Sequence, residues 1–279
     1  MKICWLIQIS ELISAKKSLI EKLNNLFIID EKHRMYETIP VDVILNSLKM
    51  SGVEGLELIF PLKSSKEMIG KVKELINKNK IQVFSIHQSN ESFYKIGLTE
   101  IEKLCKIADD FAADRITLHV DALQKNIFDA KFIKKLKKLQ KKYKVIFNIE
   151  NMPKSPITFG RTHTYIGQKF TSIIENAGLH INLDTTHLAQ NNEDICSFFI
   201  KNMGRIGNIH LSDYRTNWLN RKLLLSNYTH LALGKGELPI EKFLKLLKKE
   251  DYGGLVTMEV NSDLQGLCES AEMIKKALG

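Results

Sequence analysis

The 279-residue sequence lacks any apolar run that approaches the roughly 18–20 residues needed for a membrane-crossing helix. Its first nine residues are mostly apolar, but they lack the small-residue cleavage site of a signal peptide and are soon followed by Glu11. We interpret residues 2–9 as a first β-strand. The sequence therefore predicts a cytoplasmic protein without a membrane segment.

Two common cysteine and glycine motifs are also missing. The four cysteines are scattered without the CxxC spacing typical of zinc or redox sites, which favours reduced thiols in packing positions. No GxGxxG motif follows the first predicted strand, which argues against a doubly wound, dinucleotide-binding sheet.

The charge balance is basic, with a net charge of +9 that at first favours a nucleic-acid ligand. Much of this charge lies in residues 131–144, which read KFIKKLKKLQKKYK. Phe132, Ile133, Leu136 and Leu139 recur at helical spacing there, so the lysines fall on the opposite, solvated face of a predicted helix. Charge alone therefore does not identify a nucleic-acid-binding protein.

The pattern of apolar runs predicts eight repetitions of a strand followed by a helix. The predicted strands are residues 2–9, 55–60, 82–87, 115–119, 145–150, 181–184, 206–210 and 255–259. The predicted helices are residues 41–50, 65–79, 98–111, 130–143, 165–177, 194–203, 238–249 and 266–278. Eight such units in this length are typical of a (β/α)8 TIM barrel, an α/β fold.

With 44% apolar residues, the chain can bury one large core, so we expect residues 1–279 to form a single barrel domain. Two predicted βα loops are long, at residues 10–40 and 211–238. Long loops of this kind are usually lids or substrate walls, and the first could equally form the contact of a homo-oligomer.

Six consecutive predicted strands end on a residue that can bind a divalent metal. These residues are His87, His119, Glu150, Asp184, His210 and Glu259. The carboxyl ends of the strands meet at one rim of a barrel, where active sites are built, so the pattern predicts a metal site. Its carboxylates and imidazoles suit Mn²⁺, Mg²⁺, Co²⁺ or Zn²⁺ without selecting among them. His33, His163 and His180 fall in loops or at the strand-start face, and we expect them to be structural.

Five short motifs at these strand ends resemble a known family. They are Glu150-Asn151, Asp184-Thr-Thr-His187, His210-Leu-Ser-Asp213, His230-Leu-Ala-Leu-Gly234-Lys-Gly236 and Met258-Glu259. Their order is similar to that of the xylose-isomerase-like TIM-barrel superfamily, which joins sugar isomerases and epimerases with the endonuclease IV type of AP endonuclease (AP endonuclease family 2). The resemblance implies one divalent metal held by Glu150, Asp184, His210 and Glu259.

The sugar branch of this family implies a metal-dependent isomerase or epimerase acting on a small sugar or sugar phosphate. Glu150 and Glu259 would remove and return a proton next to a carbonyl that the metal polarises. By the same resemblance, His187, Arg215 and His230 would bind substrate oxygens. This is the function that the sequence favours.

The endonuclease branch gives the alternative, a three-zinc phosphodiesterase with damaged DNA as its partner. By this resemblance His87, His119 and Glu150 would form one site and Glu150, Asp184, His210 and Glu259 a second. His187 and His230 would hold a third ion with an aspartate two residues before His230. That position is Tyr228 here, and a neutral phenol is a poor zinc ligand. We therefore expect one or two ions, the second at His87 and His119. A barrel that binds a ligand without turnover is a further, less favoured reading.

Overall fold

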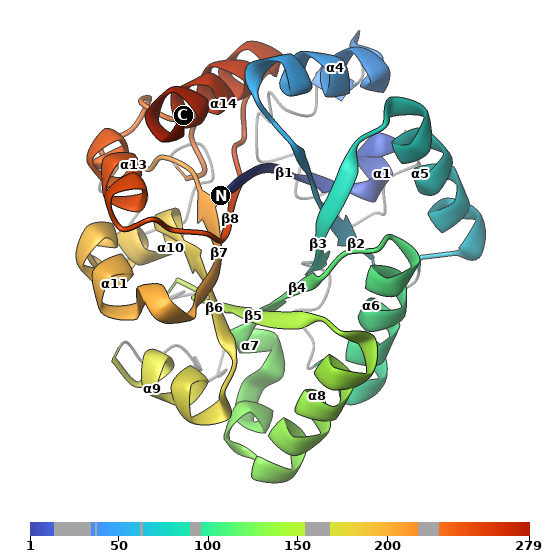
Figure 1. The fold of residues 1–279 in the computed structure, drawn as a ribbon, viewed down its shortest axis with the longest axis vertical. Coiled ribbons are helices and arrows are strands. Elements are labelled where there is room, and N and C mark those ends of the chain that lie inside the picture. Colours follow the sequence, from blue (N-terminus) through green and yellow to red (C-terminus); the bar gives the residue numbers. More distant parts are fainter. Residues whose placement is uncertain (14–34, 37, 62–63, 90–95, 154–167, 217–228) are drawn as a thin grey trace.

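Eight parallel strands follow one another in sequence order around a closed barrel (Figure 1). The computed structural model describes residues 1–13, 35–36, 38–61, 64–89, 96–153, 168–216 and 229–279. The strands are β1 (Lys2–Gln8), β2 (Gly55–Phe60), β3 (Gln82–Gln88), β4 (Arg115–His119), β5 (Ile146–Glu150), β6 (His180–Asp184), β7 (Ile206–Leu211) and β8 (Leu255–Met258). The predicted (β/α)8 barrel is confirmed, and each strand lies within about two residues of its predicted bounds.

The strand register brings the carboxyl ends of neighbouring strands to the same level. His119 pairs with Glu150 between β4 and β5, and Asp184 pairs with His210 between β6 and β7. Glu259 follows directly after β8, where its backbone N–H donates to the carbonyl of Leu211. The ends of the strands therefore form one rim that carries the predicted ligands.

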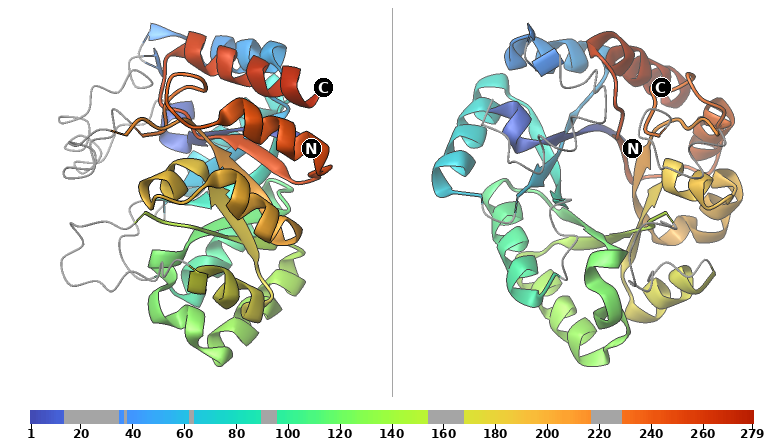
Figure 2. Two further views of the ribbon diagram at one scale, coloured as in Figure 1. Left: turned by 90° about the vertical axis from the view of Figure 1, so that its left-hand side faces the viewer. Right: turned by 180° about the vertical axis from the view of Figure 1, so that it is seen from behind.

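Helices surround the barrel as an outer ring (Figure 1). They are α1 (Ile9–Leu12), α4 (Val41–Ser51), α5 (Lys66–Asn79), α6 (Leu98–Asp110), α7 (Val120–Leu123), η1 (Gln124–Phe128), α8 (Ala130–Tyr143), α9 (Gln168–Ala177), α10 (Thr185–Gln190), α11 (Ile195–Asn202), η2 (Met203–Arg205), α13 (Ile240–Lys249) and α14 (Leu264–Leu278). Helices α11, α13 and α14 lie side by side along one flank (Figure 2), and α14 also packs on α4. The eight predicted helices occur within a few residues of their predicted bounds, although the first three residues of 165–177 lie outside the described part.

Helix α8 illustrates how local sequence determines where an outer helix begins and which of its faces is buried. Helix α8 begins after Asp129, whose side chain accepts the backbone N–H of Lys131 at 2.8 Å. Phe132 and Leu136 are buried, whereas the lysines of the helix are exposed to solvent. Burial of one apolar face against the barrel stabilises such a helix more than its intrinsic propensity does. The abundant lysine of this segment thus lies on the outer surface.

The long segments after β1 and β7 are only partly described. Residues 10–40 include the last three residues of α1 and contain residues 14–34 and 37, which lie outside the described part of the chain. After β7, Asp213 and Leu231 form an isolated antiparallel bridge, and residues 217–228 between them are also outside it. None of the helices described here is long and apolar enough to cross a membrane.

Candidate metal centre

Four of the predicted ligands meet at the carboxyl rim of the barrel. Side-chain ligand atoms of Glu150, Asp184, His210 and Glu259 all lie within 4.8 Å of one another. The first three side chains are buried, and the side chain of Glu259 is 25% exposed. A cluster of this size has the dimensions of a metal centre.

Asp184 is held firmly at the end of β6. Its Oδ1 accepts the backbone N–H of His187 at 2.6 Å and thereby caps helix α10. The Asn151 side chain bonds the Asp184 backbone twice, accepting its N–H at 2.8 Å and donating to its carbonyl at 3.1 Å. Burial raises the pKa of Asp184 to about 6, against the opposing effect of His187 and His230. The Asp184 side chain thus has a fixed position, and burial disfavours its ionised form.

Glu150 lies among imidazole rings. Its Oε2 is 3.1 Å from Nε2 of His87 and 3.5 Å from Nε2 of His119, and its Oε1 is 3.2 Å from Nδ1 of His187. Burial alone would raise the pKa of Glu150, but His210, His187 and His87 hold it well below its usual range. Burial lowers the pKa of His119 to about 4, which leaves this ring neutral at physiological pH. Glu150, His87 and His119 therefore form a second group whose ligand atoms lie within 4.8 Å of one another.

Three buried atoms of the first cluster make no hydrogen bond to any described residue. They are Oδ2 of Asp184, Nδ1 of His210 and Oε2 of Glu259. The last two atoms lie 2.8 Å apart, yet without hydrogen-bond geometry. Because buried polar atoms are almost always partnered, three such atoms on three strand ends need an explanation. A divalent cation bound by carboxylate oxygens and an imidazole nitrogen would satisfy all three, so the residues present fit such an ion.

The predicted substrate-binding residues occupy different environments. The rings of His187 and His230 meet edge to face with centroids 5.5 Å apart, and these two residues form another ligand group with Asp184. Nδ1–H of His187 donates to the Asn151 carbonyl at 2.9 Å. Burial alone would lower the pKa of His187, but Asp184 and Glu150 raise it to about 9. Arg215 is exposed, and its guanidinium donates to the carbonyl of Lys235 at 2.7 Å.

Tyr228, on which the prediction about a third ion depends, lies outside the described residues. So do two of the histidines expected to be structural, His33 and His163. The other, His180, is the half-buried first residue of β6, at the opposite end of the strand from Asp184. This placement agrees with the prediction that it lies at the strand-start face.

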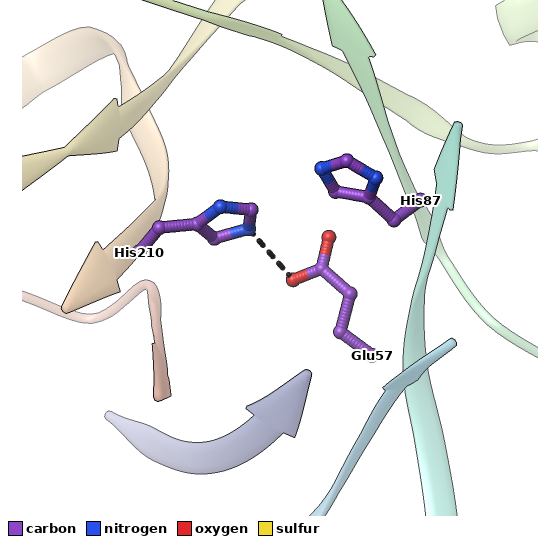
Figure 3. Close-up of side chains that lie close together, drawn as sticks. All are labelled: Glu57, His87 and His210. Carbon is purple, nitrogen blue, oxygen red and sulfur yellow. Dashed lines mark hydrogen bonds and ion pairs between the residues drawn. The ribbon is translucent and has the colours of Figure 1, made fainter. Parts of the chain in front are cut away.

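The sequence interpretation missed Glu57, a fully buried carboxylate in the middle of β2. Figure 3 shows it between His87 and His210, with its carboxylate directed at both rings. Burial alone would raise the pKa of Glu57, but His210 and His87 lower it to about 2. A charged residue inside the apolar run GLELIF was the available signal, because alternate residues of a barrel strand face the interior.

A row of uncharged polar residues inside the barrel was missed as well. Each lies two residues before one of the six predicted ligands, and therefore on the same side of its strand. These fully buried residues are Ser85, Thr117, Asn148, Asn182, Asn208 and Thr257. The interior of the barrel thus presents a polar layer directly beneath the ligand layer.

The sequence motif that ends at Asp213 was noted, but it did not predict the contacts of this residue. The buried carboxylate accepts four backbone N–H groups at 2.8–3.0 Å. These groups belong to Tyr214, Gly234, Gly236 and Leu238. A Cβ added at Gly236 would lie 2.3 Å from Oδ1 of Asp213, so only glycine allows this close approach. Asp213 therefore fixes residues 234–238, which follow His230 in the chain.

The closed barrel and its carboxylate–imidazole cluster define a (β/α)8 protein with a candidate metal centre at the rim where barrel active sites lie. Residues 45–277 match the xylose isomerase-like TIM barrel family, and the chain belongs to this family. The family resemblance expected from the strand-end motifs is therefore confirmed. A search among curated proteins found no match to the chain.

Solved structures with the same fold include sugar epimerases and a protein of the AP endonuclease type. A 3-keto-D-glucoside 4-epimerase from E. coli is 15% identical, with a TM-score of 0.64 and 99% of each chain covered. A D-allulose 3-epimerase from Methylomonas sp., in complex with D-allulose, is 13% identical with a TM-score of 0.59; the match covers 83% of this chain and 88% of the epimerase. An AP endonuclease, family 2, from Brucella melitensis is 12% identical with a TM-score of 0.62; 96% of this chain and 97% of the endonuclease are covered. At these identities the likeness shows the fold alone.

Proposed function

We propose that this protein is a divalent-metal-dependent isomerase or epimerase of a small sugar or sugar phosphate. The observation that carries the proposal is the convergence of three buried ligand atoms that make no hydrogen bond to a described residue, Oδ2 of Asp184, Nδ1 of His210 and Oε2 of Glu259. Glu150 completes the ligand set, since its carboxylate lies in the same cluster. The donors suit Mn²⁺, Mg²⁺, Co²⁺ or Zn²⁺.

The side chains of the cluster can perform proton transfer at a carbon beside a carbonyl. When bound, a divalent ion would polarise that carbonyl and make the neighbouring C–H more acidic. Glu259, whose side chain is 25% exposed, would remove or return the proton on one face. Glu150, enclosed among histidines, would serve the other face.

The remaining polar groups would hold the sugar. His187 and His230 lie beside the cluster, and both rings can hydrogen-bond hydroxyl oxygens. Arg215 would bind a more distant oxygen or a phosphate from the exposed segment after β7. Two epimerases among the structural neighbours support a sugar substrate. One is a 3-keto-D-glucoside 4-epimerase, and the other is a D-allulose 3-epimerase in complex with D-allulose.

The second candidate function is a zinc phosphodiesterase that cleaves damaged DNA. Two additional ligand groups favour it, because they overlap the first cluster at Glu150 and at Asp184. They are His87–His119–Glu150 and Asp184–His187–His230. An isomerase with one ion does not need both groups, and DNA would be the partner only in this alternative.

Solvent proton exchange tests the first candidate directly. The metal-loaded protein would be incubated in D2O with a panel of ketoses and ketose phosphates, and deuterium beside the carbonyl would be measured by mass spectrometry. We expect exchange with at least one substrate and one or two bound ions by elemental analysis. Absence of exchange throughout the panel, with efficient cleavage of abasic-site DNA by a three-zinc form, would establish the alternative. DNA binding in that case should weaken steeply with salt.

A further inference from the structure

Glu57 lies one layer beneath the candidate ligands and is surrounded by hydrogen-bond donors. Its Oε1 accepts Ser85 Oγ–H at 3.0 Å and Thr117 Oγ1–H at 2.6 Å. Its Oε2 accepts Asn208 Nδ2–H at 2.7 Å and lies 3.2 Å from Nε2 of His210. These contacts come from β3, β4 and β7, so the carboxylate connects strands across the barrel interior.

The contact between Glu57 and His210 requires a proton on Nε2 of the His210 ring. An ionised carboxylate can only accept hydrogen bonds, so Nε2 of His210 must be the donor. The other ring nitrogen, Nδ1, faces the ligand cluster, 2.8 Å from Glu259 Oε2 and 3.8 Å from Glu150 Oε1. A metal-binding histidine needs this arrangement, in which one nitrogen has a free lone pair and the other donates to a fixed acceptor.

Glu57 is close enough to His87 and His210 for these three residues to form a metal site of their own. The hydrogen bonds argue against that role. Two donors face each oxygen of Glu57, so an ion there would have to displace them. By contrast, Asp184, His210 and Glu259 in the cluster above each have a buried ligand atom that makes no hydrogen bond to a described residue.

We propose that Glu57 is a positioning residue that keeps Nε2 of His210 protonated and aims Nδ1 at the metal. The metal part of this inference rests on the proposed function, whereas the hydrogen bond between Glu57 and His210 does not. Carboxylates that hold metal-binding histidines in this way raise ligand basicity and fix ring orientation. Their loss typically weakens metal affinity about 10–100-fold.

Titration calorimetry with Mn²⁺ and with Zn²⁺ on metal-stripped protein measures the metal part. Glu57→Gln keeps the shape of the side chain but removes its charge, so we expect affinity about 10–100-fold weaker. Thr117→Val is the matched control, because it removes a donor from Oε1 and leaves the oxygen that faces His210. We expect Thr117→Val to lower the free energy of unfolding. Its metal affinity should change less than about 3-fold, well under the loss expected for Glu57→Gln.

The protonation of His210 can be read without any metal. Long-range ¹⁵N–¹H spectra of histidine-labelled, metal-free protein show which ring nitrogen carries hydrogen, and the signal missing from His210→Ala assigns the residue. We expect Nε2 of His210 to carry a proton in the folded protein, because it faces Oε2 of Glu57 at 3.2 Å. This measurement needs no Glu57 variant, so it decides the matter even if Glu57→Gln does not fold.

Three results separate failure of this inference from failure of the proposed function. An unprotonated Nε2 in the folded wild-type protein would overturn the inference. Equal loss of metal affinity in Glu57→Gln and Thr117→Val would show that Glu57 has only a structural role, and it would also overturn the inference. A wild-type protein that binds neither metal would refute the proposed metal centre, while a protonated Nε2 would still support the link between Glu57 and His210.

Discussion

Asp184 and His187 are joined by a hydrogen bond that uses only one of the two carboxylate oxygens of Asp184. Oδ1 of Asp184 accepts the His187 backbone N–H at 2.6 Å, whereas Oδ2 is buried without a hydrogen bond from any described group. The first oxygen begins helix α10 and the second is available to a metal. Because the roles lie on different atoms, a substitution can remove one and keep the other.

We expect Asp184→Asn to abolish stoichiometric metal binding while the protein remains folded. Its amide oxygen can still cap α10, but the charge and the ligand oxygen are lost. Asp194→Asn is the control, since Asp194 caps α11 in the same way by accepting the Ser197 backbone N–H at 2.8 Å. Elemental analysis of both purified variants checks the prediction. Unchanged metal content in Asp184→Asn would refute this ligand assignment.

We expect Glu259→Gln and Glu150→Gln to slow exchange of the substrate C–H proton with solvent about 10²–10⁴-fold. Each change removes a base while keeping the size of the side chain. Exchange should be measured at saturating metal, because affinity for the ion will fall as well. Glu237→Gln, an exposed change in the segment after β7, should leave the rate unaltered. Full activity in either of the first two variants would assign that glutamate a structural role.

Asp213→Ala should lower the free energy of unfolding by about 3 kcal/mol, because four backbone N–H groups lose a charged acceptor. Glu237→Gln, in the same segment but exposed, should change it by less than about 0.5 kcal/mol. Urea unfolding followed by circular dichroism measures both values. Similar stability of the two variants would show that Asp213 does not hold this segment in place.

Tyr252 should make the protein sensitive to alkaline pH. Burial raises the pKa of its phenol above the usual value, and its hydroxyl donates to the Leu255 carbonyl at 3.2 Å. The unfolded chain therefore loses this proton first, at a pKa near about 10. The stability that Tyr252 contributes is complete below that pH and is lost as the pH rises above it.

Tyr252→Phe tests this pH dependence. At pH 8 the variant should be about 1 kcal/mol less stable, because it lacks one hydrogen bond. Above about pH 10 the difference should shrink and then reverse, since phenylalanine has no proton to lose. Urea unfolding at a series of pH values gives the two stability curves. Parallel curves across the alkaline range would contradict the prediction.

The sequence by itself determined the fold and the rim of the candidate site. Apolar runs of strand length alternate with amphipathic segments such as α8, and eight such units close into a barrel. Parallel strands all end at the same rim, so a residue such as Glu150 or Asp184 at a strand end could be placed there without coordinates. This inference needs only the position of a residue within its own strand.

Only the tertiary structure decided what lies beneath that rim. Glu57 meets His210, 153 positions away in the sequence, because the closed barrel turns both side chains into one interior. Asp213 likewise gathers backbone groups from Gly234 to Leu238, which have no side-chain signal of their own. Such contacts depend on barrel closure and strand register, which bring distant segments together, whereas sequence patterns report only the periodicity of one segment at a time.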